Sequence, residues 1–97
     1  MKIRLRLYGV FRSAVESDLI ELELSSDTPT VRSALAQLFA RKDCGGLSNL
    51  ILDSQSSDAR SSTLILVSGR EIGALEGLET KLKDDDEVSL LPVAHGG

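Results

Sequence analysis

The residues best suited to chemistry in this sequence are the last two, Gly96 and Gly97, which end the chain in a bare carboxylate. Neither residue has a Cβ, so the end of the chain can pass through a channel that excludes other side chains. A flexible tail is common at any terminus, and that is the simpler interpretation. A final strand that runs into a thin di-glycine end is rarer, and it suggests that the Gly97 carboxylate is the working group.

Other residue types that carry chemistry are too isolated to form a catalytic centre. Cys44 is the single cysteine, and the single histidine, His95, lies in the tail, so no base accompanies the thiol. The pair Gly45-Gly46 is not followed by Gly-Lys-Ser/Thr, which a phosphate-binding loop requires. The acidic run 84–87 lacks the alternating ligands and spacer glycine of a calcium loop. We therefore expect no metal, no cofactor and no enzymatic activity, and we interpret Cys44 as a bystander.

The composition limits the class of protein. The 97 residues make one domain with one core, and aromatic residues are only 3%, so that core must be aliphatic. The net charge of −4 argues against nucleic acid as a direct partner, since phosphate binding needs a basic surface. A single cysteine precludes an internal disulfide, and the sequence has no apolar run of about 18 residues that could span a membrane. The first residues have a strand pattern rather than that of a signal peptide, so we expect a cytoplasmic protein.

Two strands are predicted near the start, over residues 2–7 and 20–24, because apolar and charged residues alternate there. The segment 8–18 between them is too long for a tight hairpin turn and can include a helical turn. If the strands pair, their charged side chains can face one another across the ladder, with Arg4 and Arg6 opposite Glu21 and Glu23. We favour this interpretation of the basic stripe over a nucleic-acid-binding surface.

One main helix is predicted from Val31, with Thr30 as its N-cap. Apolar residues at i, i+3, i+4, i+7 and i+8 give it one buried face as far as Phe39, and it should end near Arg41-Lys42. The Gly45-Gly46 pair then acts as a stop signal. A short helical turn is expected at 47–52, followed by a polar, low-complexity loop at 53–62.

The last third of the chain is predicted to return to strands. Residues 63–68 form one strand, 68–70 a turn, and 71–72 a short return strand, followed by an irregular segment. The final strand covers 87–91, and Pro92 stops sheet pairing because it has no backbone N–H. The chain therefore divides into a domain at 1–92 and a flexible Gly-Gly tail at 93–97.

The element order β-β-α-β-(short β)-β predicts an α+β fold. The last strand can enter the middle of a mixed sheet of four to five strands, beside the first strand and parallel to it. One main helix then packs on one face of the sheet. This topology is a β-grasp, or ubiquitin-like, fold.

Three stretches carry a resemblance to a known family: Val31–Phe39, 65–72 and, most specifically, 77–97. They look like ubiquitin-fold sulfur carriers and modifiers. This group includes the small subunit of molybdopterin synthase, the ubiquitin-related modifier of tRNA thiolation, and the small archaeal modifier proteins. The Leu-Leu-Pro-Val-Ala portion at 90–94 is similar to the molybdopterin-synthase type, whereas the final His-Gly-Gly is similar to the tRNA-thiolation modifier.

The resemblance implies a carrier that reacts at Gly97. A ubiquitin-activating-type enzyme would adenylate the carboxylate with ATP. Sulfur transfer would then give a thiocarboxylate for tRNA thiolation or molybdopterin synthesis, with a sulfur-accepting enzyme subunit as partner. Alternatively, a lysine of a target protein would attack to give an isopeptide bond, as in urmylation and sampylation. The competing hypothesis is a non-catalytic β-grasp interaction module whose Gly-Gly end is incidental.

The comparison with ubiquitin also implies a docking surface. It places Ile65, Val67, Val88 and Leu90 inward, and Ser89 outward, together with an exposed apolar patch of Leu64, Leu66 and Leu91. Such a patch usually marks a partner surface, although packing under the 53–62 loop is the alternative. Ubiquitin has an arginine where this chain has Val93, which suggests a dedicated activating enzyme of the sulfur-carrier type. The same partner should contact the remaining tail residues, Val93, Ala94, His95 and Gly96, with His95 helping to select the enzyme.

Overall fold

The computed structural model describes residues 1–25, 27–42 and 63–92. Four features predicted from the sequence therefore lie outside the described residues. They are Cys44 with the Gly45-Gly46 stop signal, the helical turn at 47–52, the loop at 53–62, and the tail at 93–97.

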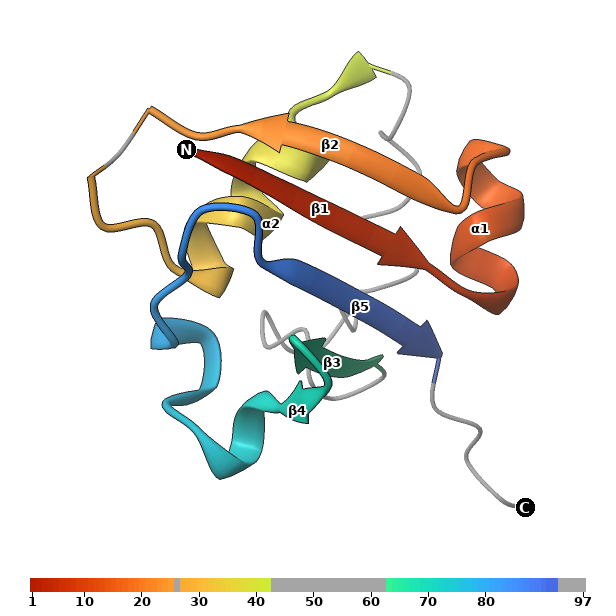
Figure 1. Ribbon diagram of the computed structural model, residues 1–97. Coiled ribbons are helices and arrows are strands. Elements are labelled where there is room, and N and C mark those ends of the chain that lie inside the picture. Colours follow the sequence, from red (N-terminus) through yellow and green to blue (C-terminus); the bar gives the residue numbers. More distant parts are fainter. Residues whose placement is uncertain (26, 43–62, 93–97) are drawn as a thin grey trace.

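A mixed sheet of five strands is the centre of the fold (Figure 1). The strands are β1 (Lys2–Leu7), β2 (Leu19–Glu23), β3 (Thr63–Val67), β4 (Arg70–Glu71) and β5 (Glu87–Pro92), in the order β2-β1-β5-β3-β4. β5 runs parallel to β1 and antiparallel to β3, and the other neighbours pair antiparallel. The predicted β-grasp topology is confirmed, with the last strand between the first and third.

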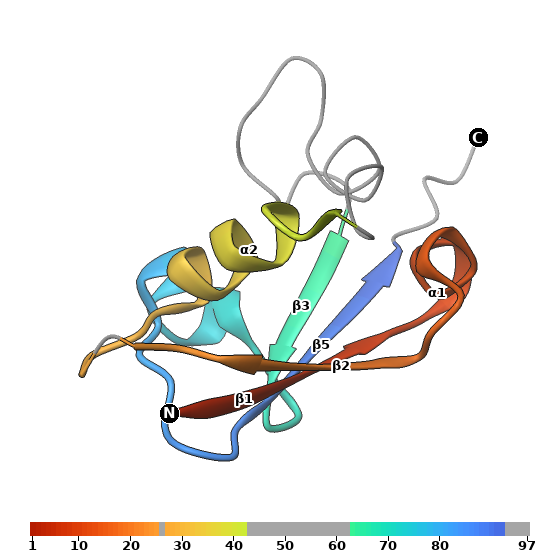
Figure 2. The same ribbon diagram turned by 90° about the horizontal axis from the view of Figure 1, so that it is seen from above.

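The main helix, α2 (Val31–Phe39), crosses one face of the sheet (Figure 2). It begins where the sequence predicts, in a capping box: Ser33 N–H donates to Thr30 Oγ1 at 3.2 Å, and Thr30 N–H donates to Ser33 Oγ at 2.8 Å. It ends at Phe39, before the predicted Arg41-Lys42, because Arg41 N–H bonds to Leu38 C=O and tightens the last turn.

Three shorter helices complete the described part of the chain. α1 (Gly9–Val15) fills the connection between β1 and β2, where only a helical turn was expected. η3 (Ile72–Ala74) and η4 (Gly77–Glu79) occupy the irregular segment. The return strand predicted at 71–72 is β4 (Arg70–Glu71), and Ile72 instead begins η3, where it is fully buried.

The core lies between α2 and the covered face of the sheet. Ile65, Val67, Val88 and Leu90 all point into it, as predicted, and Leu35 and Leu38 cover them from the helix. Phe39 is only partly buried. The other apolar residues of this cluster are Ile3, Leu5, Leu7, Phe11, Ile20, Leu22, Leu24, Val31, Ala34, Ile72 and Leu82. The cluster is aliphatic, as predicted, except for Phe11, which is one of its largest fully buried side chains.

The charged side chains of β1 and β2 lie on the uncovered face of the sheet. The prediction that Arg6 faces a glutamate of β2 was wrong. The register places Lys2 opposite Glu23 and Arg4 opposite Glu21, so Arg6 falls opposite Leu19. Arg6 pairs with β5 instead: its Nε lies 3.3 Å from Glu87 Oε2, and its Nη2 donates to Glu87 Oε1 at 3.3 Å. Local alternation identified the charged face, but the position of β5 decided the partner.

Candidate functional site

β5 brings the chain to the edge of the domain at Pro92, the residue before the predicted reactive tail. The strand is paired on both sides, with β1 and with β3, and Val88 and Leu90 are fully buried. Pro92 is the last residue of the strand, one residue beyond the predicted end at Leu91, and lies opposite Thr63 in the register. The predicted site residues Val93, Ala94, His95, Gly96 and Gly97 lie outside the described residues.

The three apolar residues predicted to form a docking patch are brought together on the uncovered face. Leu64 lies directly opposite Leu91 in the register, and Leu66 is two residues farther along β3. Leu64 is 37% exposed, and the other two are half-buried, whereas the alternating residue Ile65 is fully buried. Their outward orientation is confirmed, and their role in docking remains a prediction.

Ser89 lies on the same outer face but is buried, with 8% exposure. It stands between Arg6 of β1 and Leu66 of β3 in the register. A small side chain on a central strand is covered by longer neighbours on both sides, so its outward orientation does not make it accessible. Ser89 therefore separates the apolar patch from the charged ladder.

Tyr8 is a surface residue that the sequence reasoning missed. The residue is 41% exposed, and its backbone N–H donates to Leu90 C=O at 3.2 Å, beside Leu91. A signal was present: Tyr8 continues the alternation of Lys2, Arg4 and Arg6 along β1. We include it with the predicted residues and call the set Tyr8, Leu64, Leu66 and Leu91 the outer apolar patch.

Arg6 borders this patch, and its pKa differs from the ordinary value of an arginine. The hydrogen bond with Glu87, and then the charge of that carboxylate, raise the pKa of Arg6 above its ordinary value. The Arg6 guanidinium is therefore positively charged at every pH of interest. Because the carboxylate of Glu87 neutralises this charge, the Arg6–Glu87 pair forms a polar border of the patch on the β1 side and adds no net charge there.

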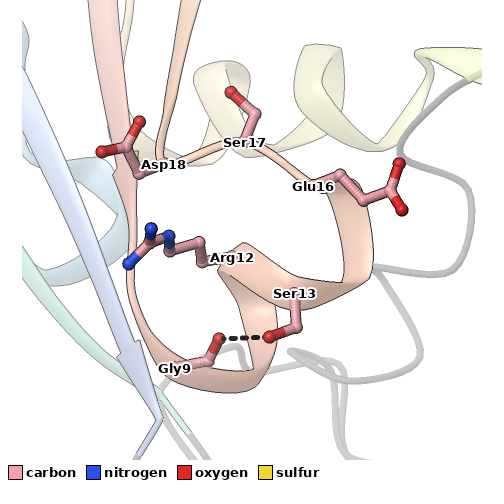
Figure 3. Close-up of a pocket in the computed structure, with 6 residues that line it drawn as sticks. All are labelled: Gly9, Arg12, Ser13, Glu16, Ser17 and Asp18. Carbon is pink, nitrogen blue, oxygen red and sulfur yellow. Dashed lines mark hydrogen bonds between the residues drawn. The ribbon is translucent and has the colours of Figure 1, made fainter.

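A shallow hollow of about 880 Å³ lies along α1 and the turn after it (Figure 3). It is lined by two hydroxyls, two carboxylates, one guanidinium and a glycine: Ser13, Ser17, Glu16, Asp18, Arg12 and Gly9. The hydroxyls already donate to backbone carbonyls, Ser13 to Gly9 at 3.4 Å and Ser17 to Leu19 at 2.9 Å. This mixture of polar groups does not converge on a reacting centre.

Within residues 1–25, 27–42 and 63–92, no three His, Cys, Asp or Glu side chains are grouped so that they could hold a metal ion. The same part of the chain has no helix long and apolar enough to cross a membrane. What the described structure offers is a strand that is paired with β1 and β3 and ends at Pro92, with an apolar surface beside it.

Comparison with known proteins agrees with this arrangement. A sequence model of the ThiS family matches residues 5–97. The chain belongs to the ThiS family. Small archaeal modifier protein 3 from Haloferax volcanii is 32% identical over 97 residues, which is 100% of both chains. The family resemblance stated from the sequence is therefore confirmed. This ThiS-family protein is a ubiquitin-like modifier and sulfur carrier rather than an enzyme.

Two solved structures show the same fold. The crystal structure of small archaeal modifier protein 1 from Haloferax volcanii matches with a TM-score of 0.83 at 18% identity, covering 100% of both chains. CysO from Amycolatopsis orientalis, in a crystal structure of its complex with BexX, matches with a TM-score of 0.76 at 18% identity, covering 98% of this chain and 99% of the other. At these identities the two structures support the β-grasp fold alone.

Proposed function

We propose that this protein acts through the carboxylate of Gly97, which a ubiquitin-activating-type enzyme adenylates with ATP. The carboxylate oxygen attacks the α-phosphate and pyrophosphate leaves, so a poor electrophile becomes an acyl adenylate. Hydrosulfide then displaces AMP to give a thiocarboxylate, or a lysine amine displaces it to give an isopeptide bond. Every step uses the main-chain end and needs no catalytic side chain of this protein.

The position of β5 is the observation that carries the proposal. This strand pairs with β1 as far as Leu90 and with β3 as far as Pro92, and two fully buried residues, Val88 and Leu90, anchor it. Five residues follow Pro92 and, fully extended, they span about 16 Å at about 3.3 Å per residue. A fixed starting point combined with a thin end suits delivery of a carboxylate into a partner's ATP site.

We further propose that the outer apolar patch is where the activating enzyme docks. The patch is next to Pro92 in the sheet, since Leu91 precedes it directly and Leu64 lies opposite Leu91. An enzyme bound there has the tail within reach of its own nucleotide. Exposed apolar clusters on a small domain usually mark partner surfaces.

For the product of activation, we place lysine conjugation first, because the curated relative that matches over its full length is named as a modifier. Sulfur donation for tRNA thiolation or molybdopterin synthesis uses the same activated carboxylate. We place either route in the cytoplasm. Mass spectrometry of material from native cells distinguishes these products. In the intact protein, a thiocarboxylate adds about 16 Da through replacement of one oxygen by sulfur. After tryptic digestion, conjugation leaves residues 84–97 as a branch on target lysines, because Lys83 is the last Lys or Arg of the chain.

The decisive experiment is ATP–pyrophosphate exchange with the cognate activating enzyme. Deletion of Gly97, or addition of one residue after it, should abolish exchange, because misplacement of a reacting group by about 1 Å can cost about 10²-fold in rate. His95→Ala is the matched control in the same tail and should retain most of the activity. All three variants should unfold at the same denaturant concentration as the wild type. Normal exchange by the deletion variant would leave the non-catalytic interaction module as the better hypothesis.

A further inference from the structure

Gly9, the first residue of α1, makes an unusually close approach to the end of β5. Its φ is +57°, and a Cβ built on it would lie 2.9 Å from Pro92 Cγ and 3.4 Å from Pro92 Cδ. The preceding residue, Tyr8, donates its N–H to Leu90 C=O at 3.2 Å. α1 therefore begins against the residues that precede the tail, at the end of the sheet where β1 and β5 finish (Figure 2).

The left-handed backbone is not the only constraint on a side chain at position 9. Gly69, in the turn before β4, also has a positive φ, +86°, yet a Cβ on it would meet nothing within 4 Å. At Gly9 the obstacle is a proline ring, which has no rotamer that could swing aside. Relief from 2.9 Å to the ordinary contact distance of 3.4 Å would require the ring to change its pucker, or the start of α1 or the end of β5 to move.

We propose that Gly9 is a positioning residue for partner docking. It lets the start of α1 pack directly on the Pro92 ring. This contact holds Tyr8, which comes before Gly9, and Leu91, which comes before Pro92, in one continuous surface. The inference rests on the proposed docking role of the outer apolar patch. In it, the contact between Gly9 and Pro92 holds Tyr8 on one side of the patch at a fixed position relative to Leu91 on the other.

The kinetic test is ATP–pyrophosphate exchange at varied concentrations of this protein. Gly9→Ala should raise KM about tenfold, equivalent to about 1.4 kcal/mol of binding free energy, with kcat within twofold of wild type because the Gly97 end is unchanged. Gly69→Ala, the matched control, has the same kind of backbone strain without the contact and should keep the wild-type KM. If Gly9→Ala proves too unstable to assay, Gly9→Asn replaces it, since asparagine tolerates the left-handed region.

A double-mutant cycle identifies the contact responsible. Pro92→Ala removes Cγ and Cδ, the two atoms that a Cβ at position 9 would meet, and by itself should raise KM about threefold. The double variant Gly9→Ala/Pro92→Ala should show the KM of Pro92→Ala alone. A wild-type KM for Gly9→Ala, or a double variant whose KM is the product of the two single effects, would overturn the proposal.

An NMR measurement tests the geometry without the activating enzyme. A nuclear Overhauser effect between the Gly9 α-protons and the Pro92 γ-protons is expected in the wild-type protein. Its absence would overturn the positioning role even if exchange activity is normal. In contrast, an observed effect together with no exchange by the wild-type protein would contradict the proposed activation and not the contact.

Discussion

The two faces of β3 allow a sharp test, because adjacent residues on this strand should respond to the same substitution in opposite ways. Ile65 is fully buried under α2, whereas its neighbour Leu64 is 37% exposed on the other face. We consider Ile65→Asp and Leu64→Asp. Each introduces one carboxylate, one into the core and the other into the outer apolar patch.

The expected magnitudes differ enough to be separated. Truncation of a buried Ile costs about 2–5 kcal/mol, and an unpaired carboxylate in the core adds several more. A domain of this size has a total unfolding free energy of about 5–15 kcal/mol. Ile65→Asp should therefore be largely unfolded. Leu64→Asp should cost about 1 kcal/mol of stability or less. Loss of an apolar anchor from an interface costs about 2 kcal/mol of binding free energy. The dissociation constant of the Leu64→Asp variant for the activating enzyme should therefore rise about 30-fold.

Circular dichroism with chemical denaturation measures the first effect, and isothermal titration calorimetry with the activating enzyme measures the second. A folded, stable Ile65→Asp variant would show that the two faces of β3 are assigned the wrong way round. A folded Leu64→Asp variant with wild-type affinity would remove Leu64 from the docking surface. Leu91→Asp, on the strand opposite, then decides whether the rest of the outer apolar patch takes part.

Two further predictions concern stability alone. Leu35→Ala should lower the free energy of unfolding by about 2–5 kcal/mol, because Leu35 is 4% exposed within the core; an unchanged urea midpoint would contradict its placement there. Thr63→Val should leave the protein as stable as the wild type or stabilise it by up to about 1 kcal/mol. In the described part of the chain, Thr63 Oγ1 is buried without a hydrogen-bond partner, so replacement by a methyl group removes a desolvated hydroxyl; a clear loss in melting temperature would indicate an unrecognised partner.

The sequence by itself determined the elements of the fold and the two faces of each long strand. Period-two alternation indicated which side chains of β1, β2 and β5 point inward, because successive side chains of a strand point to opposite faces. β3 is apolar throughout 64–67, so there the comparison with ubiquitin assigned the two faces. Thr30 fixed the start of α2 through local hydrogen bonds with Ser33. The unusual Gly-Gly end, read with the pattern before it, pointed to a carrier. These signals depend on neighbours only a few residues apart, so one sequence suffices to detect them.

The tertiary structure decided which segments far apart in the sequence meet. Arg6 pairs with Glu87 rather than with β2, Ser89 is buried between its neighbours, and Tyr8 lies beside Leu91, all because β5 inserts between β1 and β3. The close approach of Gly9 to Pro92 has the same origin. Alternation assigns a residue to a face but not to a neighbour, since the neighbour depends on strand order and register, and these are set by the packing of the whole sheet.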